Sequence, residues 1–113
     1  MTDLSEPAEA VEVVLTGELD ISTFDQAERQ VEEAERAAPS LLVIDLRALQ
    51  FVDSTGVRLI LLADQRATAA GRRLAIRLGE GPALRVFAAL GLTGRFEVLD
   101  TKPNESVQTP KSL

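Results

Sequence analysis

Hydrophobic residues recur along the chain with the periods of strands and of helices in turn. The stretches 11–16 (VEVVLT), 41–46 (LLVIDL) and 73–78 (RLAIRL) are rich in β-branched or alternating apolar residues, and each predicts a strand. Because 41–46 is apolar almost throughout, we expect it to be covered on both faces of a sheet. Shorter strands are predicted at 18–21, where an extended loop is the alternative, and at 96–99.

Between these strands, apolar residues at helical spacing predict three helices, at about 23–37, 54–70 and 82–90. Ser22 or Thr23 is the expected N-cap of the first helix, and Gly71 is a C-terminal cap candidate for the second. The side chains expected on the buried faces are Phe24, Ala27, Val31, Ala34 and Ala38, then Val57, Ile60, Leu61 and Ala67, then Leu84, Phe87 and Leu90.

The order of these elements predicts the fold class. Residues 47–53 are expected to form a loop with three inward anchors, Leu49, Phe51 and Val52. Strands that alternate with helices predict an α/β domain, in which helices pack on a sheet with parallel crossovers. We expect this domain to span 11–99, between a disordered N-terminal segment at 1–10 and a flexible polar tail at 100–113.

Composition removes several kinds of chemistry. The 113 residues contain no His, Cys, Trp or Tyr, so no Ser–His or Cys–His nucleophile pair can form, nor a site of His or Cys metal ligands. We therefore expect neither an enzyme nor a bound metal or cofactor. No apolar run reaches the roughly 20 residues that span a bilayer, and the acidic start lacks the order of a secretory signal. These features predict a cytoplasmic protein without membrane contact.

Charge is distributed unevenly around a net value of −6. Residues 1–35 hold eleven acidic residues and one basic residue, Arg29, whereas residues 36–100 carry a small positive excess. Such asymmetry orients encounters with a protein partner, although a solvated acidic helix face is the simpler interpretation. The acidic balance and the scarcity of aromatic residues argue against direct nucleic-acid binding.

The segment 51–56 (FVDSTG) joins the most apolar strand to the second helix. Ser54 directly precedes the helical periodicity, so its hydroxyl is predicted to cap free N–H groups of the first turn. Thr55 adds a second hydroxyl, and Gly56, which weakens a helix, indicates a close approach to a neighbouring segment. A helix N-terminus tolerates negative charge, so a phosphate on Ser54 would leave the fold intact. The residues alone leave two interpretations, a simple cap and a phosphate acceptor.

The chain resembles the STAS family, which takes its name from sulfate transporters and anti-sigma factor antagonists. Four stretches carry the resemblance in the family's order: 15–28 (LTGELDISTFDQAE), 41–62 (LLVIDLRALQFVDSTGVRLILL), 69–78 (AAGRRLAIRL) and 86–99 (VFAALGLTGRFEVL). The resemblance implies a STAS fold of the α/β class, with a four- to five-stranded mixed sheet packed with helices.

The resemblance also implies a function. In the family's bacterial antagonists, the Ser after the motif Asp is phosphorylated by the anti-sigma factor, a serine kinase of ATP-binding type, and the matching residue is Ser54. The unphosphorylated chain would bind that kinase and release a sigma factor, phosphorylation would switch binding off, and a PP2C-type phosphatase would restore it. We expect a monomer or weak dimer. The expected partner-binding residues are Gly17, Glu18, Asp20, Asp53, Ser54, Thr55, Gly56 and Arg58.

Two departures from the family pattern bear on the partner. Antagonists usually continue the motif with Gly-Leu-Gly, whereas this chain has Gly56-Val57-Arg58. Arg58 lies one turn into the helix, where it could change the choice of partner or hold a phosphate on Ser54. The usual C-terminal helix has no clear counterpart after Leu99.

Three alternatives stay open from the sequence. The first is a constitutive STAS accessory subunit of a lipid or solute transporter, bound to the transporter's ATPase. The second is a phosphate-accepting Asp45 at a strand end, as in response-regulator receivers; these need a Lys near a later strand end, and the first Lys here is Lys102. The third is a divalent cation site at Glu18, Asp20 and Asp53, for which a solvated acidic face is the preferred interpretation.

Overall fold

The main sheet is parallel throughout the part of the chain that the computed structural model describes, residues 10–99. Its strands pair in the order β1 (Ala10–Val14), β3 (Leu41–Asp45), β5 (Arg73–Arg77) and β6 (Glu97–Val98). Two further strands, β2 (Gly17–Leu19) and β4 (Leu49–Val52), pair in parallel as a second, small sheet. Parallel neighbours need crossover connections, which explains why helices alternate with the strands.

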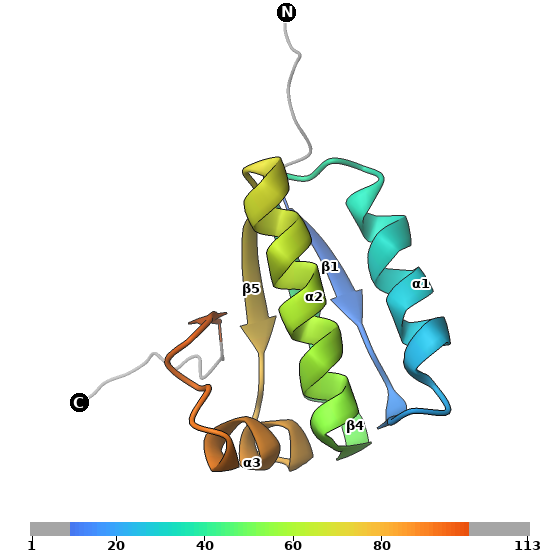
Figure 1. Cartoon of the computed structure of the whole chain (residues 1–113), viewed down its shortest axis with the longest axis vertical. Coiled ribbons are helices and arrows are strands. Elements are labelled where there is room, and N and C mark those ends of the chain that lie inside the picture. Colours follow the sequence, from blue (N-terminus) through green and yellow to red (C-terminus); the bar gives the residue numbers. More distant parts are fainter. Residues whose placement is uncertain (1–9, 100–113) are drawn as a thin grey trace, which may run out of the picture.

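The helices are α1 (Phe24–Glu35), α2 (Ser54–Ala70) and α3 (Pro82–Ala89). Figure 1 shows α1 and α2 side by side over the same face of the main sheet, with α3 beside the first turns of α2. Arg66 of α2 ties the two long helices together, because its guanidinium binds Glu35 at 2.9 Å and Glu28 at 3.3 Å. No helix in residues 10–99 is both long and apolar enough to cross a bilayer.

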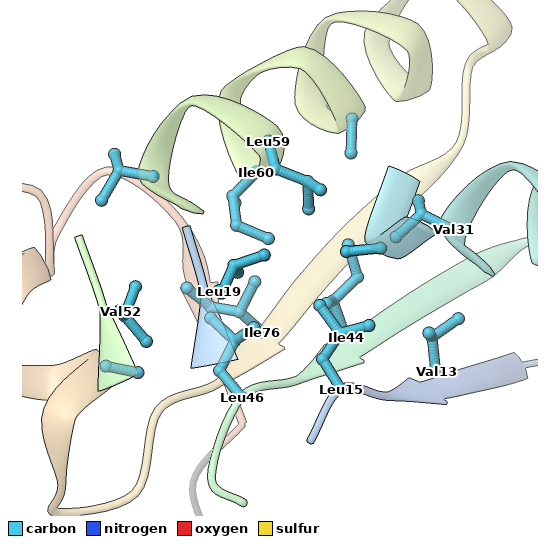
Figure 2. Close-up of a cluster of buried hydrophobic side chains, with 14 of the residues drawn as sticks. Val13, Leu15, Leu19, Val31, Ile44, Leu46, Val52, Leu59, Ile60 and Ile76 are labelled. Atoms are coloured by element: carbon cyan, nitrogen blue, oxygen red, sulfur yellow. The ribbon is translucent and has the colours of Figure 1, made fainter. Parts of the chain in front are cut away.

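Buried side chains fill the space between the sheet and the two long helices (Figure 2). Leu59 and Ile60 of α2 are fully buried against the sheet residues Ile44 and Ile76, and Val31 of α1 borders the same cluster. Every residue from 42 to 46 is buried, which confirms that this strand is covered on both faces.

The first turn of α2 packs unusually closely on the small sheet. A Cβ atom added to Gly56 would lie 2.9 Å from Leu19 Cγ and 2.9 Å from Val52 Cγ1. Both neighbours are buried, at 1% and 8% exposure, so neither can move into solvent to make room. The expected close approach at Gly56 is therefore confirmed, and its neighbours are the last residues of β2 and β4.

Most predicted elements are found in the structure, with small shifts at their ends. All three helices, the strands and the cap at Gly71 are confirmed, and Gly71 adopts the left-handed backbone with φ of 70°. The α/β class is confirmed. All strand pairs within the described residues are parallel, so the antiparallel pair that a mixed sheet requires is not among them. Ala10 already belongs to β1; the predictions for 1–9 and for 100–113 fall outside the described residues.

Three predictions about single segments are wrong. Residues 49–52 form strand β4 rather than part of a loop, because they pair with β2, and Phe51 is 47% exposed instead of facing inward. Ala38 is exposed with φ of 50°, since α1 ends at Glu35 and the chain turns toward β3. Leu90 is half exposed, because α3 ends one residue earlier.

We expect Gly56→Ala to lower the free energy of unfolding by about 1 kcal/mol. Overpacking by the new methyl group destabilises by about 1–3 kcal/mol. The higher helix propensity of Ala offsets about 1 kcal/mol of this loss. The matched control is Gly94→Ala, where an added Cβ meets nothing within 4 Å. Urea denaturation of the two variants measures the difference. Equal stability of Gly56→Ala and the control would contradict the close packing.

Asp45, at the end of β3, is the charged side chain that the described core buries, at 5% exposure. Arg47 binds it with two side-chain bonds, Nε to Oδ1 at 2.9 Å and Nη2 to Oδ2 at 2.8 Å. The backbone N–H of Arg47 donates to the same Oδ1 at 3.0 Å. These hydrogen bonds, of which the side-chain ones are strongest, lower the pKa of Asp45 and keep it ionised.

We expect Asp45→Asn to reduce the free energy of unfolding near pH 7 by about 1–3 kcal/mol, because it removes the charge that Arg47 binds. A carboxylate with a lowered pKa contributes stability above its ordinary pKa of 3.8 and loses it as the pH falls through the lowered value. Urea denaturation of both proteins near pH 7 and near pH 3 should therefore show the gap narrowing in acid. A gap that stays constant would contradict the ionised pair.

Candidate functional site

The segment after β4 is held against β2 and leads directly into α2. The backbone N–H of Asp53 donates to the carbonyl of Leu19 at 3.3 Å, which joins the ends of the two short strands. Asp53 has an extended backbone and is the N-cap of α2, where its Oδ1 accepts the N–H of Thr55 at 2.9 Å. The prediction that the Ser54 hydroxyl caps this helix is therefore wrong, because the carboxylate one residue earlier already occupies that role.

Ser54 is the first residue of α2, and its side chain is exposed. Its hydroxyl has no hydrogen-bond partner among residues 10–99. Thr55 beside it is half-buried. The N–H of Gly56 donates to the carbonyl of Asp53 at 2.9 Å, so the backbone of this turn is satisfied without the hydroxyl. A group attached to the Ser54 oxygen would therefore extend into solvent and break no described bond.

The turn after β2 is ordered by Asp20. Its Oδ1 accepts the hydroxyl of Ser22 at 2.7 Å and the N–H of Ser22 at 2.9 Å, and the N–H of Thr23 approaches it at 3.2 Å. The hydrogen bond from the Ser22 hydroxyl is the main cause of the lowered pKa of Asp20. Thr23 is the N-cap residue of α1 but makes no capping bond, since its hydroxyl donates to the carbonyl of Glu18 at 2.8 Å.

Two depressions flank this turn, and five of the eight predicted partner-binding residues line them. Gly17 and Glu18 border the first, between β2 and α1. The second lies where α1 and α2 begin. Its lining residues are Ile21, Phe24, Asp25, Ser54, Thr55 and Arg58.

The remaining predicted residues lie around these depressions. Asp20 and Asp53 stand at the ends of β2 and β4, where their carboxylates accept backbone N–H groups. Gly56 is buried beneath the surface, so its role here is to let α2 approach the small sheet. The expected proximity of the 17–20 loop and the start of α2 is thus found, through the β2–β4 pairing.

Two apolar residues that line the depression around Ser54, Ile21 and Phe24, and a third in β4, Phe51, were missing from the predicted site. Ile21 is 82% exposed, Phe51 is 47% exposed, and Phe24 carries the guanidinium of Arg58 at 5.7 Å from its ring centroid. Ile21 is an isolated large apolar residue in a polar turn, and that pattern could have marked it as a surface contact. Phe51 could not be found this way, because its direction depends on the pairing of β4 with β2.

The acidic residues of the site do not form a cation site in residues 10–99, where no group of at least three candidate ligands is gathered. Asp20 and Asp53 instead use their carboxylates to order a turn and a helix start. Asp45 belongs to a different place, the end of β3, where Arg47 occupies both of its oxygens. These bonds give Asp45 a structural role and provide no support for a receiver-type acceptor.

Comparisons with solved structures identify the architecture. An anti-sigma factor antagonist from Mycobacterium paratuberculosis superimposes with a TM-score of 0.72 at 23% identity, covering 92% of this chain and 86% of that one. The anti-sigma factor antagonist SpoIIAA in its unphosphorylated form gives a TM-score of 0.68 at 24% identity, with coverage of 93% and 90%. The predicted STAS fold is confirmed.

Sequence comparisons agree with the structural ones. A curated relative named anti-sigma F factor antagonist, from Paenibacillus polymyxa, is 33% identical over 94 residues, which covers 82% of this chain and 78% of the relative. The family model described as "Mlab, STAS domain" matches residues 2–100. By this match and by its curated relative, the chain belongs to the STAS-domain family.

Proposed function

We propose that this protein is an anti-sigma factor antagonist whose binding is controlled at Ser54. The unphosphorylated chain binds an anti-sigma factor with serine kinase activity and thereby releases a sigma factor. Phosphorylation of Ser54 by that kinase ends binding, and a PP2C-type phosphatase restores it. The observation that carries the proposal is the exposed Ser54 hydroxyl, which the fold does not use although it stands on the first turn of α2.

The electrostatics of the site support such a switch. A phosphate on Ser54 adds about −1.5 to −2 charges at neutral pH. It would stand next to the capping Asp53, at a depression that Asp25 also lines. A partner that docks here must remove water from that charge, and a loss of about 2.7 kcal/mol weakens binding about a hundredfold. No change of fold is needed for this effect.

The apolar surface around Ser54 supports a protein partner. Ile21 lines the same depression as Ser54 and is 82% exposed, and Phe51 of β4, three residues before Ser54 in the chain, is 47% exposed. Full burial of one such side chain contributes about 1.5–3 kcal/mol, enough for these two residues to act as anchors. A kinase that binds this surface would bring its ATP site close to the Ser54 oxygen.

Ser54 is predicted to be the phosphate acceptor. An affinity pull-down with the full chain, with and without ATP, supplies the partner, and incubation with it and ATP should label wild type and Thr55→Ala but not Ser54→Ala. We expect Ser54→Ala to keep its free energy of unfolding within about 0.5 kcal/mol of wild type. Asp53→Ala should instead cost about 1 kcal/mol for the lost cap.

Two results would count against this proposal. Label on Thr55 with Ser54 unmodified would move the acceptor, and a folded Ser54→Ala that fails to bind would make the hydroxyl itself the contact. Recovery of a transporter ATPase with membrane partners, and of no kinase, would favour the accessory-subunit function instead.

Ile21 is predicted to be an interface anchor. Because its side chain is 82% exposed, Ile21→Ala should leave the free energy of unfolding almost unchanged but weaken binding of the anti-sigma factor about tenfold or more. Leu90→Ala is the control, since Leu90 is another exposed large apolar residue, at 50%, but lies at the end of α3. Isothermal titration calorimetry measures both, and equal affinities of the two variants would place the interface elsewhere.

A further inference from the structure

A phosphate on Ser54 would stand at a helix start where the next two backbone N–H groups are already engaged. The N–H of Thr55 is already taken by the Asp53 carboxylate, and the N–H of Gly56 donates to the Asp53 carbonyl. The helix dipole is likewise compensated by the negative charge of Asp53 at the cap. Any counter-charge that the protein itself supplies to the phosphate therefore comes from a side chain.

Arg58 is the basic residue among those that line the depression around Ser54. It follows Ser54 by four positions in α2, and side chains four apart on a helix are neighbours, with about 5–6 Å between their Cβ atoms. Arg58 is exposed, and its guanidinium rests over the ring of Phe24 at 5.7 Å from the centroid. An exposed cation–π contact is worth only about 0.5–1 kcal/mol, so a phosphate can replace it.

We infer that Arg58 binds the phosphate of phosphorylated Ser54 and leaves the ring of Phe24 to do so; this inference rests on the proposed function. The guanidinium presents two parallel N–H donors that match phosphate oxygens, which an ammonium group cannot do. Phosphorylation then has two effects on one surface. It adds negative charge at Ser54, and it moves the Arg58 side chain away from Phe24, so a partner fitted to the unmodified surface loses both features.

The inference is tested on the full chain with phosphoserine placed genetically at position 54, in wild type, Arg58→Gln and Arg36→Gln. Arg36 is the matched control: an exposed Arg after the last residue of α1, opposite the end that borders the depression. A nearby cation favours the dianion, so ³¹P NMR should show the second phosphate pKa about 0.5 unit higher in Arg58→Gln than in wild type. Arg36→Gln should match wild type, and about 1 M NaCl should reduce the difference.

The inference would be overturned if the second phosphate pKa were equal in wild type and Arg58→Gln. It would also be overturned if Arg36→Gln raised that pKa as much as Arg58→Gln does. Because the phosphate is installed during synthesis, this titration does not depend on a kinase. If no kinase modifies Ser54, the proposed function fails while the Arg58 contact is still measured. If a kinase modifies Ser54 but the second phosphate pKa is the same in wild type and Arg58→Gln, only the role of Arg58 fails.

Discussion

The contact between Gly56 and the ends of the two short strands is the constraint on which this site depends. Because Gly56 has no side chain, the first turn of α2 packs directly against Leu19 and Val52. The N–H of Asp53 donates to the carbonyl of Leu19 at the same place. The position of Ser54 relative to the β2 turn follows from this packing. A buried apolar contact thus determines where a polar surface group stands.

The division of work between Asp53 and Ser54 follows from the same local geometry. A helix start needs an acceptor for its free N–H groups, and the Asp53 carboxylate provides it. Ser54, the next residue, therefore does not cap the helix, although Ser is itself a good capping residue. In the proposed function, its hydroxyl would gain or lose a phosphate while the bonds that hold the helix stay in place. This separation allows a chemical change at the surface without a change of fold.

The periodic segments were predictable from the sequence, since α1, α2 and α3 bury the faces that their apolar spacing indicates. The exceptions are residues whose environment depends on a distant partner. Strand β4 is too short and irregular to be recognised until β2 is placed beside it, and the exposure of Phe51 follows only from that pairing. The cap of α2 was misassigned because Asp53 and Ser54 are both good capping residues, and backbone angles decide between them. The 54–58 segment could be identified from its motif, whereas the Arg58–Phe24 contact required the packing of α1 beside α2.

The proposed function requires that a phosphate on the Ser54 hydroxyl weaken partner binding strongly while it leaves the fold unchanged. Its most direct test compares the chain carrying phosphoserine at position 54 with the unmodified chain, by calorimetric titration against the anti-sigma factor and by urea denaturation. The account predicts affinity lower by about a hundredfold, with a free energy of unfolding within about 1 kcal/mol of the unmodified chain. Equal affinities, or a weakened affinity that merely follows unfolding of the modified chain, would contradict it.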